Sequence, residues 1–166
     1  MLKLLKWTAI ALVGLVALLL VDGYAMSPKF TASRSTTIAA PADKVYALMA
    51  APREWKRWAV WNQRDPAMQI TYSGPPSGAG AGWAWKSKSE GDGKMSFTAA
   101  EANRRLAYEL FFPDFGTTST GALELAADGA ATRVTWSMNG DMGSNPLFRW
   151  LALFVAGAVF LVAART

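Results

Sequence analysis

The alternation of apolar and polar residues predicts β-strands through most of this chain. Between Leu106 and Phe112, every second residue is apolar or aromatic, which is the two-residue period of a strand with one buried face. The same period recurs between turn residues such as Asp128-Gly129. The predicted strands are Phe30–Ile38, Met68–Ser73, Trp83–Ser87, Met95–Glu101, Leu106–Phe112, Thr117–Ala126 and Arg133–Met138.

Helical spacing interrupts this pattern in three places. Pro41 opens a short helix, whose apolar stripe is Val45, Leu48 and Met49, and Pro52 ends it. Tryptophans at 55, 58 and 61 recur at every third position, which suits one side of a second short helix. A last helix is predicted over Leu147–Ala164, with Leu147, Trp150, Leu151 and Phe154 spaced to pack on the sheet. An antiparallel sheet with one apolar face needs such a cover, so the prediction is an α+β fold.

The N-terminal segment is apolar enough to cross a membrane. As a helix, Leu4–Val21 would span about 27 Å, close to the hydrocarbon core of a bilayer. Lys3 and Lys6 precede its uncharged part and Asp22 follows, so the positive-inside rule places the rest of the chain outside the cytoplasm. Residues 1–26 are therefore either an uncleaved single-pass anchor or a signal peptide cut near Gly23–Ala25.

Composition narrows the chemistry that this chain can perform. It has no cysteine and no histidine, which excludes disulfides, cysteine zinc sites and nucleophiles paired with histidine. Its 12 acidic residues show no ligand-like spacing, so we expect no metal and no cofactor. The net charge of +5, part of it at the chain ends, is too small to indicate nucleic-acid binding.

Six stretches, in this order, resemble the SRPBCC superfamily, the START-like helix-grip fold, and within it the polyketide cyclase/dehydrase-like group. They are Ser35–Tyr46, Trp55–Trp61, Trp83–Trp85, Asn103–Tyr108, Thr132–Trp136 and Gly140–Pro146. The resemblance implies that residues 27–166 form a curved antiparallel sheet of seven strands, with two short helices and a covering C-terminal helix. The superfamily includes lipid carriers, binders of hydrophobic ligands, cyclases and oxygenase subunits.

The end of the chain departs from that pattern. Relatives usually finish with an amphipathic helix, whereas Trp150–Ala164 is uncharged and apolar on all sides, and residues 155–166 are an atypical hydrophobic end. Three interpretations stay open. The segment is a second membrane segment, a helix buried against a membrane or partner, or a truncated or altered end.

Aromatic residues supply the candidate site. The chain has eight Trp, eight Phe and four Tyr. Several fall where the helix-grip fold lines its interior, and they would form either a packed core or a pocket for a flat apolar ligand. Glu101 and Tyr108 are the candidate polar anchors, Arg133 falls on the outer face by alternation, and no catalytic residue is assigned. The predicted ligand-binding residues are Trp58, Trp61, Trp83, Trp85, Phe97, Glu101, Tyr108, Phe112 and Trp136.

The sequence thus predicts membrane-anchored, non-catalytic binding of a hydrophobic small molecule or lipid. The cavity would lie between the sheet and the final helix. The alternatives are a polyketide cyclase/dehydratase-like enzyme and an accessory membrane protein without a ligand. The expected partners are the ligand and the membrane, and the oligomeric state is left open.

Overall fold

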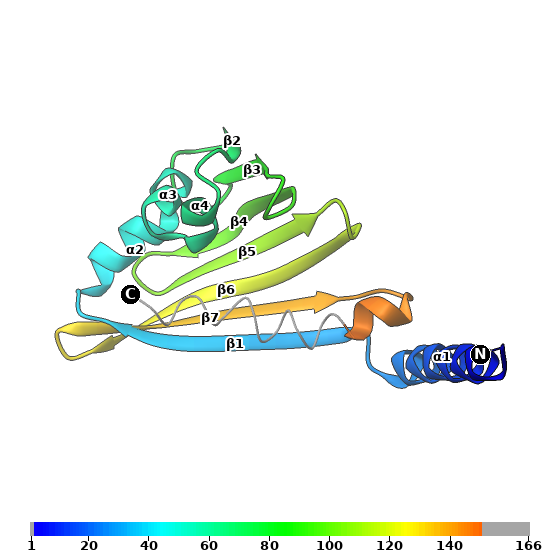
Figure 1. Cartoon of the computed structure of the whole chain (residues 1–166). Helices are drawn as coiled ribbons and strands as arrows, with labels where there is room; N and C mark the ends of the chain where they lie inside the picture. Colours follow the sequence, from blue (N-terminus) through cyan, green and yellow to red (C-terminus); the bar gives the residue numbers. More distant parts are fainter. Residues whose placement is uncertain (1, 151–166) are drawn as a thin grey trace.

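A seven-stranded antiparallel sheet forms the body of the domain (Figure 1). The computed structural model describes residues 2–150. The strands lie in the order β1-β7-β6-β5-β4-β3-β2. Their bounds are β1 Lys29–Ile38, β2 Gln69–Ser73, β3 Gly82–Lys86, β4 Gly93–Glu101, β5 Arg105–Phe112, β6 Thr117–Asp128 and β7 Ala131–Asp141. The predicted α+β fold of the helix-grip type, with seven strands, is confirmed.

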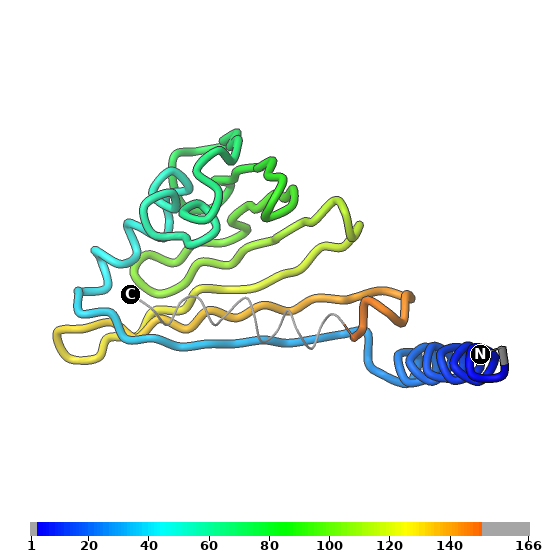
Figure 2. Tube along the Cα trace, viewed as in Figure 1, coloured from blue at the N-terminus to red at the C-terminus, as the bar shows by residue number. Residues whose placement is uncertain are grey.

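The first strand returns to pair with the last one. β2 to β7 form a meander, whereas β1 lies beside β7, in a register that runs from Lys29 opposite Asp141 to Ile38 opposite Thr132. The trace in Figure 2 shows these two strands side by side over their whole length. The start of β1 and the end of β7 therefore meet at one corner of the sheet.

The connection from β1 to β2 holds four short helices. They are α2 (Ala42–Ala50), the 3-10 helix η1 (Pro52–Glu54), α3 (Trp55–Trp58) and α4 (Val60–Arg64). The single helix expected around the three tryptophans is wrong, because Ala59 is extended (φ −74°, ψ 125°) and separates α3 from α4. Trp61 therefore lies on its own helical turn. We call the side of the sheet that these helices cover the inner face.

The N-terminal helix α1 (Leu2–Ala25) lies beyond the sheet corner where β1 begins (Figure 1). Within its segment Lys3–Ala25, the most apolar 18-residue stretch has a mean hydropathy of 2.4, and none of that stretch is buried by the rest of the protein. By length and composition this helix can cross a membrane. Orientation and cleavage stay predictions.

The predicted C-terminal helix starts near the expected place. Residues 146–150 are helical, and the rest of Leu147–Ala164, including Leu151 and Phe154, lies outside the described residues. The expectation that Leu147 packs on the sheet is wrong, because its side chain is 55% exposed. The Trp150 indole donates a hydrogen bond to the Leu19 carbonyl of α1 (2.9 Å). The start of this helix is therefore held against α1.

Three aromatic rings each cover a glycine directly across a strand pair. The pairs are Tyr108 with Gly121, Phe30 with Gly140, and Trp85 with Gly93. A Cβ atom on any of these glycines would overlap the opposing ring. Glycine here lets a large ring lie flat on the neighbouring strand and fill the space that a side chain would occupy.

Candidate ligand-binding site

Trp55 is the centre of an aromatic cluster on the inner face. Its ring centroid lies 4.5 Å from that of Trp58 and 4.8 Å from that of Trp83. Further rings surround it at centroid distances of 5.7 to 6.2 Å, those of Trp136, Trp61 and Phe97. We call these six residues the aromatic cluster. They come from α3, α4, β3, β4 and β7, so the cluster joins the short helices to strands on both sides of the sheet centre.

Burial divides this cluster into a floor and a rim. Trp55, Trp83 and Phe97 are buried, with exposed fractions of 4% or less. Trp58, Trp61 and Trp136 are only partly buried and pack against that floor. The floor is a packed core, because its rings contact one another at 4.8 to 6.2 Å. Within the cluster, only the three rim residues keep exposed aromatic surface that a ligand could cover.

Backbone carbonyls at the end of α2 fix the tryptophans of α3. The Trp55 Nε1–H donates to the Met49 carbonyl (2.8 Å), and the Trp58 Nε1–H donates to the Leu48 carbonyl (3.4 Å). Carbonyls in the last turn of a helix have no partner within the helix, so these bonds satisfy them. They also satisfy the indole N–H groups, which would be costly to bury unpaired.

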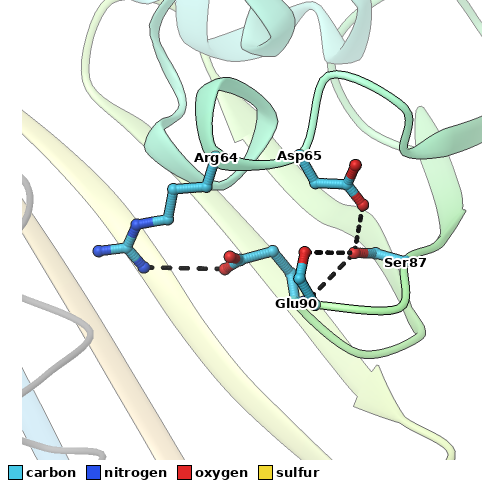
Figure 3. A network of polar contacts seen from close by, with 5 residues as sticks. Arg64, Asp65, Ser87 and Glu90 are labelled. Atoms are coloured by element: carbon cyan, nitrogen blue, oxygen red, sulfur yellow. Dashed lines mark hydrogen bonds and ion pairs between the residues drawn. The ribbon is translucent and has the colours of Figure 1, made fainter.

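A polar network holds α4, and with it Trp61, against the turn between β3 and β4 (Figure 3). The Ser87 hydroxyl donates to an Asp65 carboxylate oxygen (2.6 Å) and accepts the Glu90 backbone N–H (3.0 Å). Arg64 lies 3.7 Å from the Glu90 carboxylate. The end of α4 is therefore tied to the hairpin by side-chain contacts.

Tyr108 links the rim to the interior. The Trp136 Nε1–H donates to the Tyr108 hydroxyl (2.7 Å), which donates in turn to the Ser137 carbonyl (2.9 Å). Burial raises the pKa of Tyr108 to about 12, and the bond from Trp136 lowers that pKa by a smaller amount. The hydroxyl is thus protonated at neutral pH, and its single proton is used within the protein.

The other predicted site residues lie apart from the cluster. Trp85 packs edge-on against Phe112 (6.3 Å), and both are partly buried. Glu101 is exposed at the end of β4, and its carboxylate lies 3.7 Å from the Arg104 guanidinium. Arg133 is exposed and lies 3.6 Å from the Asp128 carboxylate, as its place on the outer face predicted. The structure thus brings Tyr108 to the cluster and leaves Glu101 at the surface.

A protein-family model described as "Polyketide cyclase / dehydrase and lipid transport" matches residues 29–163. The chain belongs to this family. The predicted resemblance to the SRPBCC superfamily is confirmed. No curated protein sequence matches the chain.

Solved structures share the fold of this polyketide cyclase/dehydrase family member. Truncated norcoclaurine synthase from Thalictrum flavum is similar with a TM-score of 0.62 at 12% identity, over 82% of this chain and 89% of that one. A protein from Thermobifida fusca gives 0.60 at 20%, over 80% and 84%. Mll3558 from Rhizobium loti gives 0.55 at 21%, over 83% and 97%. At these identities the likeness shows the fold alone.

Two surface pockets among the described residues have none of the six cluster residues of this family member in their lining. One, of about 290 Å³, lies on the outer face over β4 to β7, where Arg105, Glu109 and Asn139 line it together with Tyr108. The other, of about 230 Å³, lies between Arg53, Tyr72 and the loop at Pro75-Pro76. The predicted cavity, between the sheet and the final helix, depends on residues outside the described ones.

Sequence reasoning missed Trp55 as a member of the site. It is 1% exposed and contacts every other ring of the cluster. The sequence feature that could have indicated Trp55 is its position as the first of three tryptophans at every third residue, followed by Trp58 and Trp61. A single helix through all three residues would not predict their different burial. The break at Ala59 is what places Trp55 in the buried floor and Trp61 on the partly exposed rim.

Proposed function

We propose that this protein binds a hydrophobic small molecule or a lipid on the aromatic rim of its inner face, without chemistry, while α1 anchors it in a membrane. The observation that carries the proposal is the rim itself. Trp58, Trp61 and Trp136 stay partly exposed on a floor of buried rings. Apolar sites of this kind use flat aromatic walls with few polar groups. The family description, which includes lipid transport, supports the same class of ligand.

The polar groups near the rim support binding rather than catalysis. The Tyr108 hydroxyl, which would have to donate to a substrate carbonyl, already donates to Ser137. Glu101, the candidate base, is exposed and paired with Arg104, and the chain has no histidine or cysteine. A cyclase-like enzyme, the alternative, would need an acid or base on the rim, and general acid–base catalysis requires such a group within hydrogen-bond reach of the substrate.

A titration of the full chain in lipid nanodiscs tests the binding. Trp7→Phe and Trp150→Phe first remove the tryptophans nearest the apolar segments, so that emission reports on the domain. A dansyl-labelled undecanoic acid is the probe, because tryptophan emission excites the dansyl group. We expect saturable energy transfer above the level of protein-free discs.

Substitutions on the rim should weaken this binding. Trp61→Ala removes ring surface that a ligand would cover, which corresponds to about a ten- to hundredfold loss of affinity. Trp85→Ala, on β3 but outside the cluster, should give a smaller loss of affinity. Leu48→Ala is the control, because its exposed side chain lies on α2, outside the cluster. Equal affinities in all three variants, or no transfer above empty discs, would reject the rim as the site.

A further inference from the structure

The end of the domain next to α1 carries an exposed apolar surface. Outside α1, the large apolar side chains exposed among the described residues are Leu48, Phe111, Phe115 and Leu147. Of these, Phe111 lies near the end of β5, Phe115 in the loop that follows it, and Leu147 in the helical start at 146–150. We call Phe111, Phe115 and Leu147, with exposed fractions of 39%, 42% and 55%, the apolar tip.

The tip is connected to α1 through the helical start at 146–150. The Phe115 ring packs edge-on against Phe148 at 5.6 Å. In the same helical start, Arg149 donates through Nη1 to the carbonyls of Tyr24 (2.9 Å) and Met26 (3.0 Å), and at 3.3 Å to that of Gly23. A guanidinium at this place satisfies carbonyls at the end of α1 and complements the negative end of its dipole.

Close packing reinforces this connection. Gly23 is buried against Pro146, and a Cβ atom on Gly23 would come within 2.7 Å of the Pro146 carbonyl oxygen. The Met142 backbone N–H donates to the Pro28 carbonyl (2.8 Å). Together with the Trp150–Leu19 bond, these contacts fix the last turn of α1 to the helical start that carries Leu147.

We propose that the apolar tip rests in the interfacial layer of the same bilayer that α1 spans. The proposal rests on the membrane anchoring proposed above. If α1 crosses the bilayer, its last turn lies at the membrane–water interface, and the tip attached to that turn lies there too. The Trp150 indole bonds to the Leu19 carbonyl and Arg149 bonds to the Tyr24 carbonyl, so a tryptophan and a tyrosine lie along the last two turns of α1, and these are the residues enriched at a membrane interface.

The tip is suited to contact by apolar insertion rather than by charge. The segments that meet here carry charges of both signs. The acidic residues are Asp22, Asp114 and Asp141, and the basic residues are Lys29 and Arg149. We therefore expect the contact to persist at high salt, unlike binding through a basic patch. Behind the tip, Phe112 packs against Phe115 and Trp85 against Phe112, each at 6.3 Å. These packed rings connect the tip to Trp85, which packs against the core.

Single-cysteine labelling of the full chain tests the contact, because the protein has no native cysteine. Asp114→Cys places a bimane label beside Phe115 without removing an apolar side chain of the tip. Ala130→Cys is the control, in the exposed turn between β6 and β7 at the far end of the sheet from α1 (Figure 1). The proteins are reconstituted in phosphatidylcholine–phosphatidylglycerol vesicles that carry a nitroxide on the lipid headgroup.

We expect the label at 114 to be quenched several-fold more than the label at 130, at low and high salt alike. Leu147→Ser in the labelled protein should reduce that quenching, because this side chain is exposed and its loss removes apolar contact without opening the core. If the chain floats with the vesicles but both labels are quenched equally, or quenching is unchanged by Leu147→Ser, the tip inference is wrong and α1 remains an anchor. A chain that does not float with the vesicles overturns the anchoring and the tip together.

Discussion

At the scale of single residues, the glycines opposite aromatic rings explain how the sheet accommodates its largest side chains. Gly121 lies directly across from Tyr108, and the Tyr108 ring crosses it to reach the Ser137 carbonyl on the next strand. A side chain at 121 would block that path. The polar chain from Trp136 through Tyr108 to Ser137 therefore depends on a residue that makes no polar side-chain contact itself.

Gly121→Ala should destabilise the domain by about 1–3 kcal/mol, the usual cost of overpacking a closely packed site. The added methyl group would overlap the Tyr108 ring and the Ser137 carbonyl oxygen, so one of them must move. Chemical unfolding of the detergent-solubilised chain measures the loss. Thr120→Ala, the exposed neighbour on β6, is the matched control, and a loss as large for Thr120→Ala would refute the steric explanation.

Tyr108 should make stability depend on alkaline pH. Its pKa is raised from 10.0 to about 12 in the folded protein, so the folded state holds this proton more tightly than the unfolded state does. The resulting stabilisation, about 2–3 kcal/mol, is present below pH 10 and is lost as the pH rises from 10 toward 12.

Tyr108→Phe should remove that alkaline loss, and at neutral pH it should cost about 1–3 kcal/mol because Trp136 loses its acceptor. The free energy of unfolding is measured across this pH range for the wild type, Tyr108→Phe and Tyr72→Phe. The comparison separates this effect from the general titration of lysines. Parallel curves for Tyr108→Phe and the wild type would contradict it.

At the scale of elements, the sequence predicted the strands better than their partners. Alternation located each strand to within a few residues, because a strand with one buried face repeats locally every second residue. The pairing of β1 with β7 is not visible in that pattern, since it joins residues about a hundred positions apart, such as Ser35 and Thr135.

The candidate site was predicted in part, for the same physical reason. Aromatic residues on the inner face could be read from alternation, and Trp83, Phe97, Tyr108 and Trp136 are indeed brought together. The division into floor and rim could not be read, because it depends on the break at Ala59 and on how α3 and α4 lie across the sheet. Glu101 looked close to the aromatic strands by position, but β4 ends there, at the surface.

The Ser87 network should control how firmly α4 holds Trp61 on the rim. Ser87→Ala removes the donor to Asp65 and the acceptor of the Glu90 N–H, which should cost about 1–2 kcal/mol. Faster hydrogen exchange in Val60–Arg64 and in the β3–β4 turn, measured by mass spectrometry, is the expected signature. Ser89→Ala is the control, because Ser89 makes only a 3.5 Å contact with Ser87. Unchanged exchange in Ser87→Ala would show that packing alone holds α4.

At the scale of the whole molecule, one corner of the sheet organises the protein. β1 begins and β7 ends there, α1 leads into it, and the helical start at 146–150 leaves from it. Arg149 ties these segments together through carbonyls at the end of α1. α1 is therefore attached to the domain by direct contacts rather than by a flexible linker alone.

This coupling predicts that α1 stays in the mature protein. Cleavage after Ala25 would remove the Gly23 and Tyr24 carbonyls that Arg149 binds, and it would uncover Pro146. We therefore expect the intact mass of the membrane-extracted protein to include the residues of α1, and we expect detergent, but not alkaline carbonate, to release it from membranes. Arg149→Ala should leave membrane retention unchanged, because the apolar length of α1 is unaltered, but should lower the unfolding temperature. A mature terminus at Met26, with release by carbonate, would instead make residues 1–25 a signal peptide and the domain a secreted protein.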